Sequence, residues 1–364
     1  MILAYIVYTG LLSCLGISAC TISRIRENRS VLNWVSLIPI ILASIILGCR
    51  YDVGVDFPTY LEYYKEIERH TGYIPFEVGY DYINRLCSSL GFDYYVVLGI
   101  TVFIQLSFFY LSLDKHRFLL PYAILFFFLT GQLFFQLNAV RQAMSSMIFL
   151  FAVRFIESRE FVRYAVVILF ASLFHTSSLL LLPVYAFGFC KYPSWLEERK
   201  IAILLYVVTA VVSNYFMVSA MEGITQLFLL IGKGGYAYTV KGWDMEVNSG
   251  LGILLLKMLD GLTLWLACGL VKKNVFGFGI FYRIFFIGTL LGNLFGINVV
   301  LSRIPFPLLC TRPIVLAYLF YFTYRWGKRG WLTLTFILCA YILLYLANIA
   351  NGANQCSPYY FFSH

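Results

Sequence analysis

The sequence predicts an all-α polytopic membrane protein, a bundle of about 10–12 transmembrane helices. Hydrophobic residues make up 61% of the 364 residues and charged residues only 12%, whereas a soluble domain carries about 25% charged residues. The mean hydropathy is +0.80. Long apolar runs recur along the chain, without the alternating polarity that a membrane β-barrel needs. These observations exclude a cytosolic globular protein, a disordered chain and a secreted disulfide scaffold.

The apolar runs are the predicted spans, because about 20 apolar residues in a helix cross the hydrocarbon core. The net charge of +9 comes largely from short basic clusters between the runs. Such clusters orient a membrane protein, so nucleic-acid binding is not expected. No repeat, low-complexity tract or linker interrupts the chain, which is interpreted as a single transmembrane domain over residues 1–364. The predicted spans are 1–20, 33–48, 94–113, 118–136, 143–157, 164–189, 201–220, 251–271, 276–299, 304–323 and 331–350.

Charge also predicts the sidedness of the loops. If every basic cluster is cytoplasmic, the N-terminus and the loops 49–93 and 221–250 lie outside. Residues 164–189 are flanked by basic clusters on both sides, and at about 1.5 Å per residue they are too short to cross the core twice. Either this run bends near His175 into a re-entrant pair of short helices, or the cluster at 190–200 lies outside. We favour the bend, because a polar His-Thr-Ser-Ser stretch falls inside the run.

The long loop 49–93 is predicted to hold two amphipathic helices at the outer membrane surface. The first covers residues 58–70. Pro58 fits its first turn, and Thr59 with Glu62 fits a capping box.

The second amphipathic helix is predicted over residues 77–90, with Gly91 as its stop signal. Helical spacing places three apolar side chains on one of its faces, namely Tyr82, Leu86 and Leu90.

Ionisable residues beside apolar runs are the first candidates for a functional site. Arg50, Asp52 and Asp56 directly follow the second run, and Tyr60 comes just after them. Either carboxylate can serve as a general base, and the guanidinium can bind a phosphate group or neutralise the aspartates. Local chemistry alone favours the alternative that Arg50 is a membrane-interface anchor paired with Asp52.

A second polar group lies between two runs. Asn138, Arg141 and Gln142 are spaced i, i+3 and i+4, so a continuous helix carries all three on one face. A fork-shaped cation flanked by amides suits a phosphate or a sugar. The alternative is a polar turn. Arg141 departs from the positive-inside trend, which favours the functional interpretation.

His175 and Arg303 complete the candidates. His175 lies inside an apolar run, where it can act as acid or base or, equally well, be a structural histidine bonded to a carbonyl. Arg303 falls near the outer end of a span. Arg312 lies deeper and needs a partner, for which Asp260 is the candidate. A lone histidine, and cysteines without a C-x-x-C pair, do not predict a metal site, and no other cofactor is expected.

These elements, in this order, resemble the EpsG family of bacterial polysaccharide polymerases, a Wzy-like group. The resemblance covers residues 45–185 by motif and the second half of the chain by hydropathy alone, with Arg303 as a weaker match to a later arginine. The glutamate element departs from the family pattern, because Val78 replaces its proline. The matching elements are Arg50-x-x-x-Gly54-x-Asp56-x-x-x-Tyr60, Glu77-Val78-Gly79-Tyr80, Asn138-x-x-Arg141-Gln142 and His175-Thr176-Ser177.

The resemblance implies a metal-independent glycosyltransferase of the bacterial cytoplasmic membrane, with its active site facing the periplasm or exterior. Such a polymerase joins oligosaccharide repeat units carried on undecaprenyl pyrophosphate into O-antigen (the lipopolysaccharide chain), capsule or exopolysaccharide. Donor and acceptor are both lipid-linked oligosaccharides within the bilayer. A chain-length regulator and a flippase are the protein partners that the family implies.

On this interpretation the site residues receive roles. Asp52 or Asp56 accepts the proton of the acceptor hydroxyl, and His175 assists. Arginines bind the pyrophosphate and stabilise its departing charge. The expected substrate-binding residues are Arg50, Tyr60, Glu77, Asn138, Arg141, Gln142 and Arg303.

Three other membrane functions stay as alternatives. An O-antigen ligase shares the donor, but usually has its large outer loop late in the chain, whereas here the longest loop is early. A transporter or flippase of lipid-linked sugar predicts internal repeats, which the sequence lacks. A membrane acyltransferase places its histidine toward the cytoplasm, whereas the predicted topology places His175 within the membrane or toward the outside.

Overall fold

The structure is a computed structural model that describes residues 1–25, 30–70, 76–189, 197–230, 250–296, 301–323 and 327–362. These residues are almost entirely helical, with one two-stranded sheet. The chain packs as two compact units. The first contains residues 1–188 and 316–364, and the second contains residues 189–315. That the two together form a single membrane domain stays a prediction.

The helices confirm an all-α polytopic membrane protein. Five described helices are long and apolar enough to cross a membrane, and a bent pair makes a sixth. The prediction of about 10–12 spans counted every apolar run as one crossing. Several of these runs instead form helices of 10–17 residues. The five candidate spans are Ile2–Ile22, Tyr94–Ser112, Leu251–Val271, Phe278–Phe295 and Gly330–Ala350.

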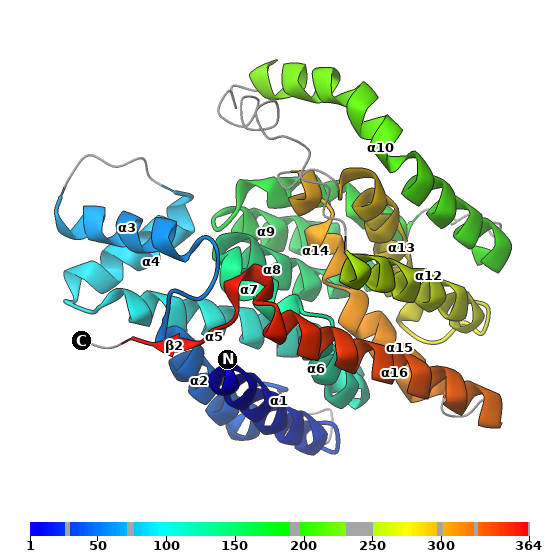
Figure 1. The fold of residues 1–364 in the computed structure, drawn as a ribbon, viewed down its shortest axis with the longest axis horizontal. Coiled ribbons are helices and arrows are strands. Elements are labelled where there is room, and N and C mark those ends of the chain that lie inside the picture. The colour runs from blue at the N-terminus through cyan, green and yellow to red at the C-terminus, as the bar shows by residue number, and fades with distance from the viewer. Residues whose placement is uncertain are drawn as a thin grey trace. The chain divides into compact units, whose positions relative to one another are not determined.

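The first unit is organised around α5 (Tyr94–Ser112), which contacts both α2 (Trp34–Gly48) and α8 (Val140–Glu157) (Figure 1). Helices α2 and α5 approach closely because glycines face each other: a Cβ on Gly48 would lie 2.8 Å from the Cα of Gly99. Two further helices pack around this centre. These are α1 (Ile2–Ile22) and α6 (Leu120–Leu129), with η1 (Asp114–Leu119) between α5 and α6.

The run predicted as a span over 118–136 is bent. Helix α6 is followed by α7 (Gln132–Asn138) at an angle of 63°. Gly131 makes the turn with φ +74°, in the left-handed region. The C-terminal part of the chain returns to the same unit, where α16 (Gly327–Ala350) contacts α6 and η6 (Ala353–Gln355) contacts α7. The last strand, β2 (Tyr360–Phe361), pairs antiparallel with β1 (Arg50–Tyr51).

The two helices predicted in the loop 49–93 are present. They are α3 (Phe57–Glu68) and α4 (Val78–Ser89). The predicted capping box of Thr59 and Glu62 is wrong: the N-cap is Asp56, three residues before Thr59, and it makes no side-chain cap. The start moves because the backbone N–H of Asp56 donates to the Asn138 side chain, which fixes the chain before the helix.

Helix α4 shows the predicted amphipathic pattern and the predicted stop. Gly91 has φ +71°, the left-handed conformation expected after a helix end. The side chains of Tyr82, Leu86 and Leu90 are exposed on one face. The opposite face is buried and carries Tyr80, Asn84 and Cys87. That the exposed apolar face lies on the membrane surface stays a prediction.

The bend predicted near His175 is confirmed. Helix α9 (Phe161–Ser172) ends before it, and η2 (Thr176–Gly188) starts after it. The two segments fold back on each other, because the Tyr164 hydroxyl donates to the Leu181 carbonyl at 2.6 Å. Residues 164–189 are therefore a hairpin of two short helices in this structure. The basic cluster at 190–200 lies partly outside the described residues.

The second unit contains α10 (Arg199–Leu230), which packs against α12 (Leu251–Val271) and α13 (Phe278–Phe295). The predicted loop 221–250 is wrong at its start, since α10 continues to Leu230; residues 231–249 lie outside the described part. The remaining helices are η4 (Leu301–Arg303), α14 (Phe306–Leu309) and α15 (Arg312–Thr323), whose last residues belong to the first unit.

The partner predicted for Arg312 is confirmed. Its Nε and Nη2 both donate to the carboxylate of Asp260, each at 2.7 Å. Both side chains are largely buried, so each neutralises the other inside an apolar bundle.

Candidate functional site

Glu77 is the centre of a polar cluster in the first unit. One carboxylate oxygen pairs with the Arg141 guanidinium. The other lies 3.2 Å from Nδ1 of His175 and accepts the backbone N–H of Thr176 at 3.3 Å. Glu77 lies at the start of α4, Arg141 in the first turn of α8, and His175 at the bend after α9. Packing thus brings together three of the elements that the sequence singled out.

The cluster remains accessible from outside the unit. The side chains of Glu77, Arg141 and His175 are 17%, 20% and 19% exposed. This exposure is enough for a ligand to reach the groups, while most of each side chain is held by neighbours. A partly buried cation of this kind interacts with an anion more strongly than a fully solvated one.

The charge of Glu77 is secured by its partners. Burial alone would raise the pKa of this carboxyl, but the His175 hydrogen bond and the Arg141 charge lower it from 4.5 to about 2. Because the pKa is lowered on folding, this ionic contribution to stability is complete above pH 4.5 and is lost as the pH falls toward 2. Glu77 is therefore ionised at every physiological pH.

Two aromatic rings pack against the guanidinium of Arg141. The guanidinium carbon lies 4.0 Å from the ring centre of Phe76 and 5.8 Å from that of Tyr60. Tyr60 is only 4% exposed, so its ring packs against Arg141 and is not available to stack on a ligand from solvent. Sequence reasoning missed Phe76. Its signal was an aromatic residue directly before the Glu-x-Gly-Tyr element.

Gly79 allows the start of α4 to pack closely against the bend at His175. Its backbone N–H donates to the Leu173 carbonyl at 2.7 Å. A Cβ at this position would lie 2.9 Å from that oxygen and 3.1 Å from the Phe174 ring. The glycine thus sets the approach of α4 to α9, and with it the contact between Glu77 and His175.

We expect Gly79→Ala to destabilise the first unit by about 1–3 kcal/mol, because the methyl group overpacks a contact that includes backbone. Thermal unfolding of the purified full-length protein in detergent measures the loss. Gly16→Ala in α1 is the matched control, since a Cβ there meets nothing within 4 Å. Equal melting temperatures for the two variants would contradict the close-docking interpretation.

Asn138, Arg141 and Gln142 do not share one helix face, contrary to the prediction. The helix breaks at Ala139, where φ is −87° and ψ is +63°. Asn138 therefore belongs to α7, where its side chain accepts the Asp56 backbone N–H at 2.8 Å. Gln142 is buried in α8, and its backbone carbonyl accepts hydrogen bonds from the hydroxyls of Ser145 and Ser146.

Arg50 is buried and binds backbone. It is 1% exposed, and its guanidinium donates to the carbonyls of Leu47 at 2.6 Å and Leu137 at 3.2 Å. These carbonyls lie at the ends of α2 and α7, so Arg50 joins the two helix ends. The alternative pairing with Asp52 is not what the structure shows. Gly54, with φ +104°, completes the contact, because a Cβ there would lie 2.8 Å from the Leu137 oxygen.

The remaining candidates lie apart from these contacts. Asp52 is exposed at φ +51°, and within the described residues its carboxylate has no hydrogen bond or ion pair. Asp56 is half-buried at the N-cap of α3. Arg303 ends η4 in the second unit. Among the residues that the structure describes, no group of three or more metal-ligating side chains is placed to hold a metal ion.

Four sequence elements thus meet in one unit: the Arg50–Asp56 segment touches Asn138, and Glu77 joins Arg141 to His175. Comparison with protein families finds the EpsG family, whose model matches residues 33–361. The chain belongs to the EpsG family. No curated protein and no solved structure matches it. Membership makes the chain a Wzy-like, polysaccharide-polymerase-type membrane protein, and its apolar helices make it multi-pass.

Proposed function

We propose that this EpsG-family protein polymerises oligosaccharide repeat units carried on undecaprenyl pyrophosphate, at the outer face of the bacterial cytoplasmic membrane. Family membership supports the polymerase class. The single observation that carries the site is the contact of Glu77 with both Arg141 and His175. It sets a cation and a proton-accepting group side by side in an accessible position.

Arg141 is the proposed ligand of the pyrophosphate. Glu77 occupies one of its nitrogens, and a guanidinium has five N–H donors. Its Nε is buried without a hydrogen-bond partner among the described residues, so a ligand would reach the exposed part of the guanidinium, in a side chain that is 20% exposed. As the pyrophosphate leaves, its negative charge grows, and a preorganised guanidinium stabilises that charge most where water is partly excluded.

His175 is the proposed proton acceptor. When Nδ1 carries the proton, it donates to Glu77 and leaves Nε2 as an acceptor. In the proposed step the acceptor hydroxyl oxygen bonds to the anomeric carbon, and the bond from that carbon to the pyrophosphate oxygen breaks. The hydroxyl proton passes to Nε2, and the pyrophosphate departs with the bonding electrons. Direct displacement inverts the anomeric carbon.

The other site residues receive supporting roles in this proposal. Asp52 and Asp56, one of which is expected from the sequence to be the base, have a different role in this proposal: they lie on the segment beside Asn138 and accept hydrogen bonds from sugar hydroxyls. Arg50 and Tyr60 act by position, since both are buried. Gln142 supports the start of α8, and Arg303, which lies in the second unit, stays a predicted substrate-binding residue. The protein partners implied by the family, a chain-length regulator and a flippase, belong to the same proposal.

Deletion of the gene tests the function. We expect the ladder of long surface glycan on a gel to disappear while single-repeat material remains, and the wild-type gene to restore the ladder. Loss of all surface glycan, with lipid-linked polymer accumulating, would instead identify a ligase. Accumulation of single units on the cytoplasmic side would identify a transporter. An unchanged ladder in a host with no second polymerase gene would contradict the proposal.

A further inference from the structure

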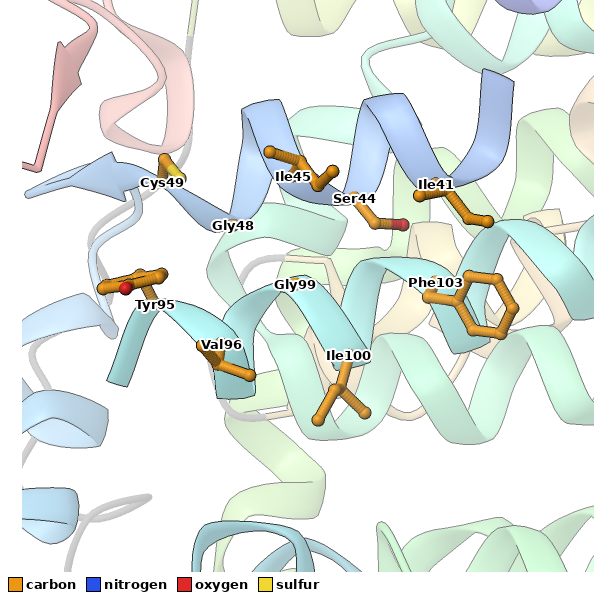
Figure 2. A pocket seen from close by; sticks show the side chains of 10 residues that line it. All are labelled: Ile41, Ser44, Ile45, Gly48, Cys49, Tyr95, Val96, Gly99, Ile100 and Phe103. Carbon is orange, nitrogen blue, oxygen red and sulfur yellow. The ribbon is translucent and has the colours of Figure 1, made fainter. Parts of the chain in front are cut away.

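Residues 353–362 follow α16 and return to the Arg50–Asp56 segment of the first unit, and we call them the strap. Their strand β2 pairs antiparallel with β1. The pairing extends beyond the two strands, because the Phe362 N–H donates to the Cys49 carbonyl at 2.7 Å. Figure 2 shows Cys49 and Tyr95 at the same end of a pocket between α2 and α5. The Phe362 ring lies 5.5 Å from the Tyr95 ring, so this end of the strap contacts both helices.

Two tyrosine hydroxyls bind the strap to the surrounding helices. The Tyr359 hydroxyl donates to the Ile46 carbonyl in α2 at 2.9 Å. The Tyr8 hydroxyl in α1 donates to the Cys356 carbonyl at 2.8 Å. Tyr359 and Cys356 are only 2% and 1% exposed, so the strap is a packed part of the first unit.

The Arg50–Asp56 segment depends on partners for its conformation. Asp52 has φ +51° and Gly54 has φ +104°, both in the left-handed region. Strand β1 has two residues and is too short to be stable alone. Gly54 is buried, and its N–H donates to the Gln355 carbonyl of the strap at 3.3 Å. Without the strap, this N–H and the backbone groups of β1 lose their partners, which costs free energy.

The segment connects the strap to the start of α8, where Arg141 lies. The Arg50 guanidinium donates to the Leu137 carbonyl at 3.2 Å, and the Asp56 N–H donates to the Asn138 side chain at 2.8 Å. Leu137 and Asn138 are the last residues of α7, and α8 follows after one residue with Arg141 in its first turn. Helix η6 of the strap also contacts α7. The strap therefore holds α7 both directly and through the segment.

We infer that the strap positions the Arg50–Asp56 segment and the start of α8 for the polymerisation step. The Phe362 N–H and the Tyr359 hydroxyl are its positioning groups. This inference rests on the proposed function and adds a part of the chain that acts through α7. A displacement of about 1 Å at a reacting group can lower a rate on the order of 100-fold. When the strap loosens, Arg141 loses its fixed position and the chemical step slows.

Two matched variants of the full-length protein test the Tyr359 hydroxyl. Tyr359→Phe removes its bond to Ile46, whereas Tyr5→Phe removes a similar bond, to the Leu346 carbonyl at 3.0 Å, that joins α1 to α16 outside the strap. We expect kcat to be about fivefold lower in Tyr359→Phe than in Tyr5→Phe, with the KM for the lipid-linked donor changed less than about twofold. A merely structural bond would lower the melting temperature without this difference in kcat. Equal kcat values would overturn the positioning role.

A disulfide tests the same role reversibly. Phe362→Pro removes the N–H that donates to Cys49 and is expected to lower kcat about tenfold, while Phe361 before it stays extended, as a residue before proline prefers. Tyr51 and Tyr360 face each other, and facing Cα atoms of an antiparallel pair lie about 4.5–5.5 Å apart, within disulfide range. Adding Tyr51→Cys and Tyr360→Cys to Phe362→Pro is therefore expected to restore kcat on oxidation, and dithiothreitol is expected to remove the gain. Phe362→Pro alone, oxidised and reduced in the same way, is the control. Failure of the disulfide to form, or a disulfide that leaves kcat low, would contradict the inference.

Hydrogen–deuterium exchange separates this inference from the proposed function, because it needs no activity. In nanodiscs, the N–H groups of residues 53–57 are expected to exchange about tenfold faster in Phe362→Pro than in the wild type, since one hydrogen bond of the strap is lost. Helix α9 is the internal control and is expected to exchange alike in both proteins. Unchanged exchange at 53–57 would overturn the strap and leave the function intact. If the wild-type protein forms no polymer, the function falls, and the exchange result alone decides whether the strap holds the segment.

Discussion

Arg141→Ala is expected to abolish the long glycan ladder and to lower polymerisation by the purified protein on the order of 100-fold to 1,000-fold. The alanine removes the charge that binds the pyrophosphate, and it leaves Glu77 with His175 as its remaining side-chain partner. Turnover with a lipid-linked donor, measured by product length on a gel, gives the effect. Arg141→Lys is expected to recover only a small part, because an ammonium is a point charge without the fork of a guanidinium.

The matched control is Arg163→Ala. This arginine lies in the same unit, pairs with Glu160 and is 70% exposed. It is expected to polymerise like the wild type, because exposed ion pairs contribute little. A full ladder with Arg141→Ala, in a protein that melts at the wild-type temperature, would remove Arg141 from the pyrophosphate site.

His175→Gln and Glu77→Gln are each expected to lower kcat on the order of 100-fold, the usual contribution of a positioned acid–base group. Glu77 is a positioning residue that acts through His175 and Arg141, so the double variant is expected to be little worse than either single one. Single-turnover kinetics with a lipid-linked donor and acceptor measure the rate for each single variant and for the double variant.

The pH profile distinguishes a catalytic role from a structural one. Because the pKa of Glu77 is about 2, no rate change between pH 5 and 8 is expected from its titration. His175→Gln removes the proposed proton acceptor, so its kcat is expected to be low across this whole pH range. His70→Gln and Glu62→Gln are the controls, since both residues are exposed on or beside α3. Loss of kcat in Asp52→Asn or Asp56→Asn, with His175→Gln active, would give the base role to an aspartate.

Several sequence predictions failed at points where a distant contact decides local structure. Thr59 and Glu62 have the spacing of a capping box, yet the helix starts at Phe57 because Asp56 is bound by Asn138. Asn138 and Arg141 have helical spacing, yet the helix breaks at Ala139, a residue with the highest helix propensity. Local pattern carries no signal for either event.

The sequence alone predicts the all-α membrane class and most of the helical segments, and it selects the ionisable residues as site candidates. Hydropathy and helix period are local properties that can be read from the sequence. An ionisable group beside an apolar run costs free energy to bury, so it is a candidate for a functional site. The bend at His175 followed from the same cost, since a polar stretch inside an apolar run favours a break.

Which of these residues meet depends on how the helices pack. Glu77 is separated from Arg141 by 64 residues and from His175 by 98. Arg50 has aspartates close by in sequence, yet it binds the carbonyls at two helix ends. Partners of this kind depend on the angle and approach of whole helices, such as the close contact that Gly79 permits against Leu173. The sequence pattern identifies the ionisable side chains, and helix packing sets the distances between them.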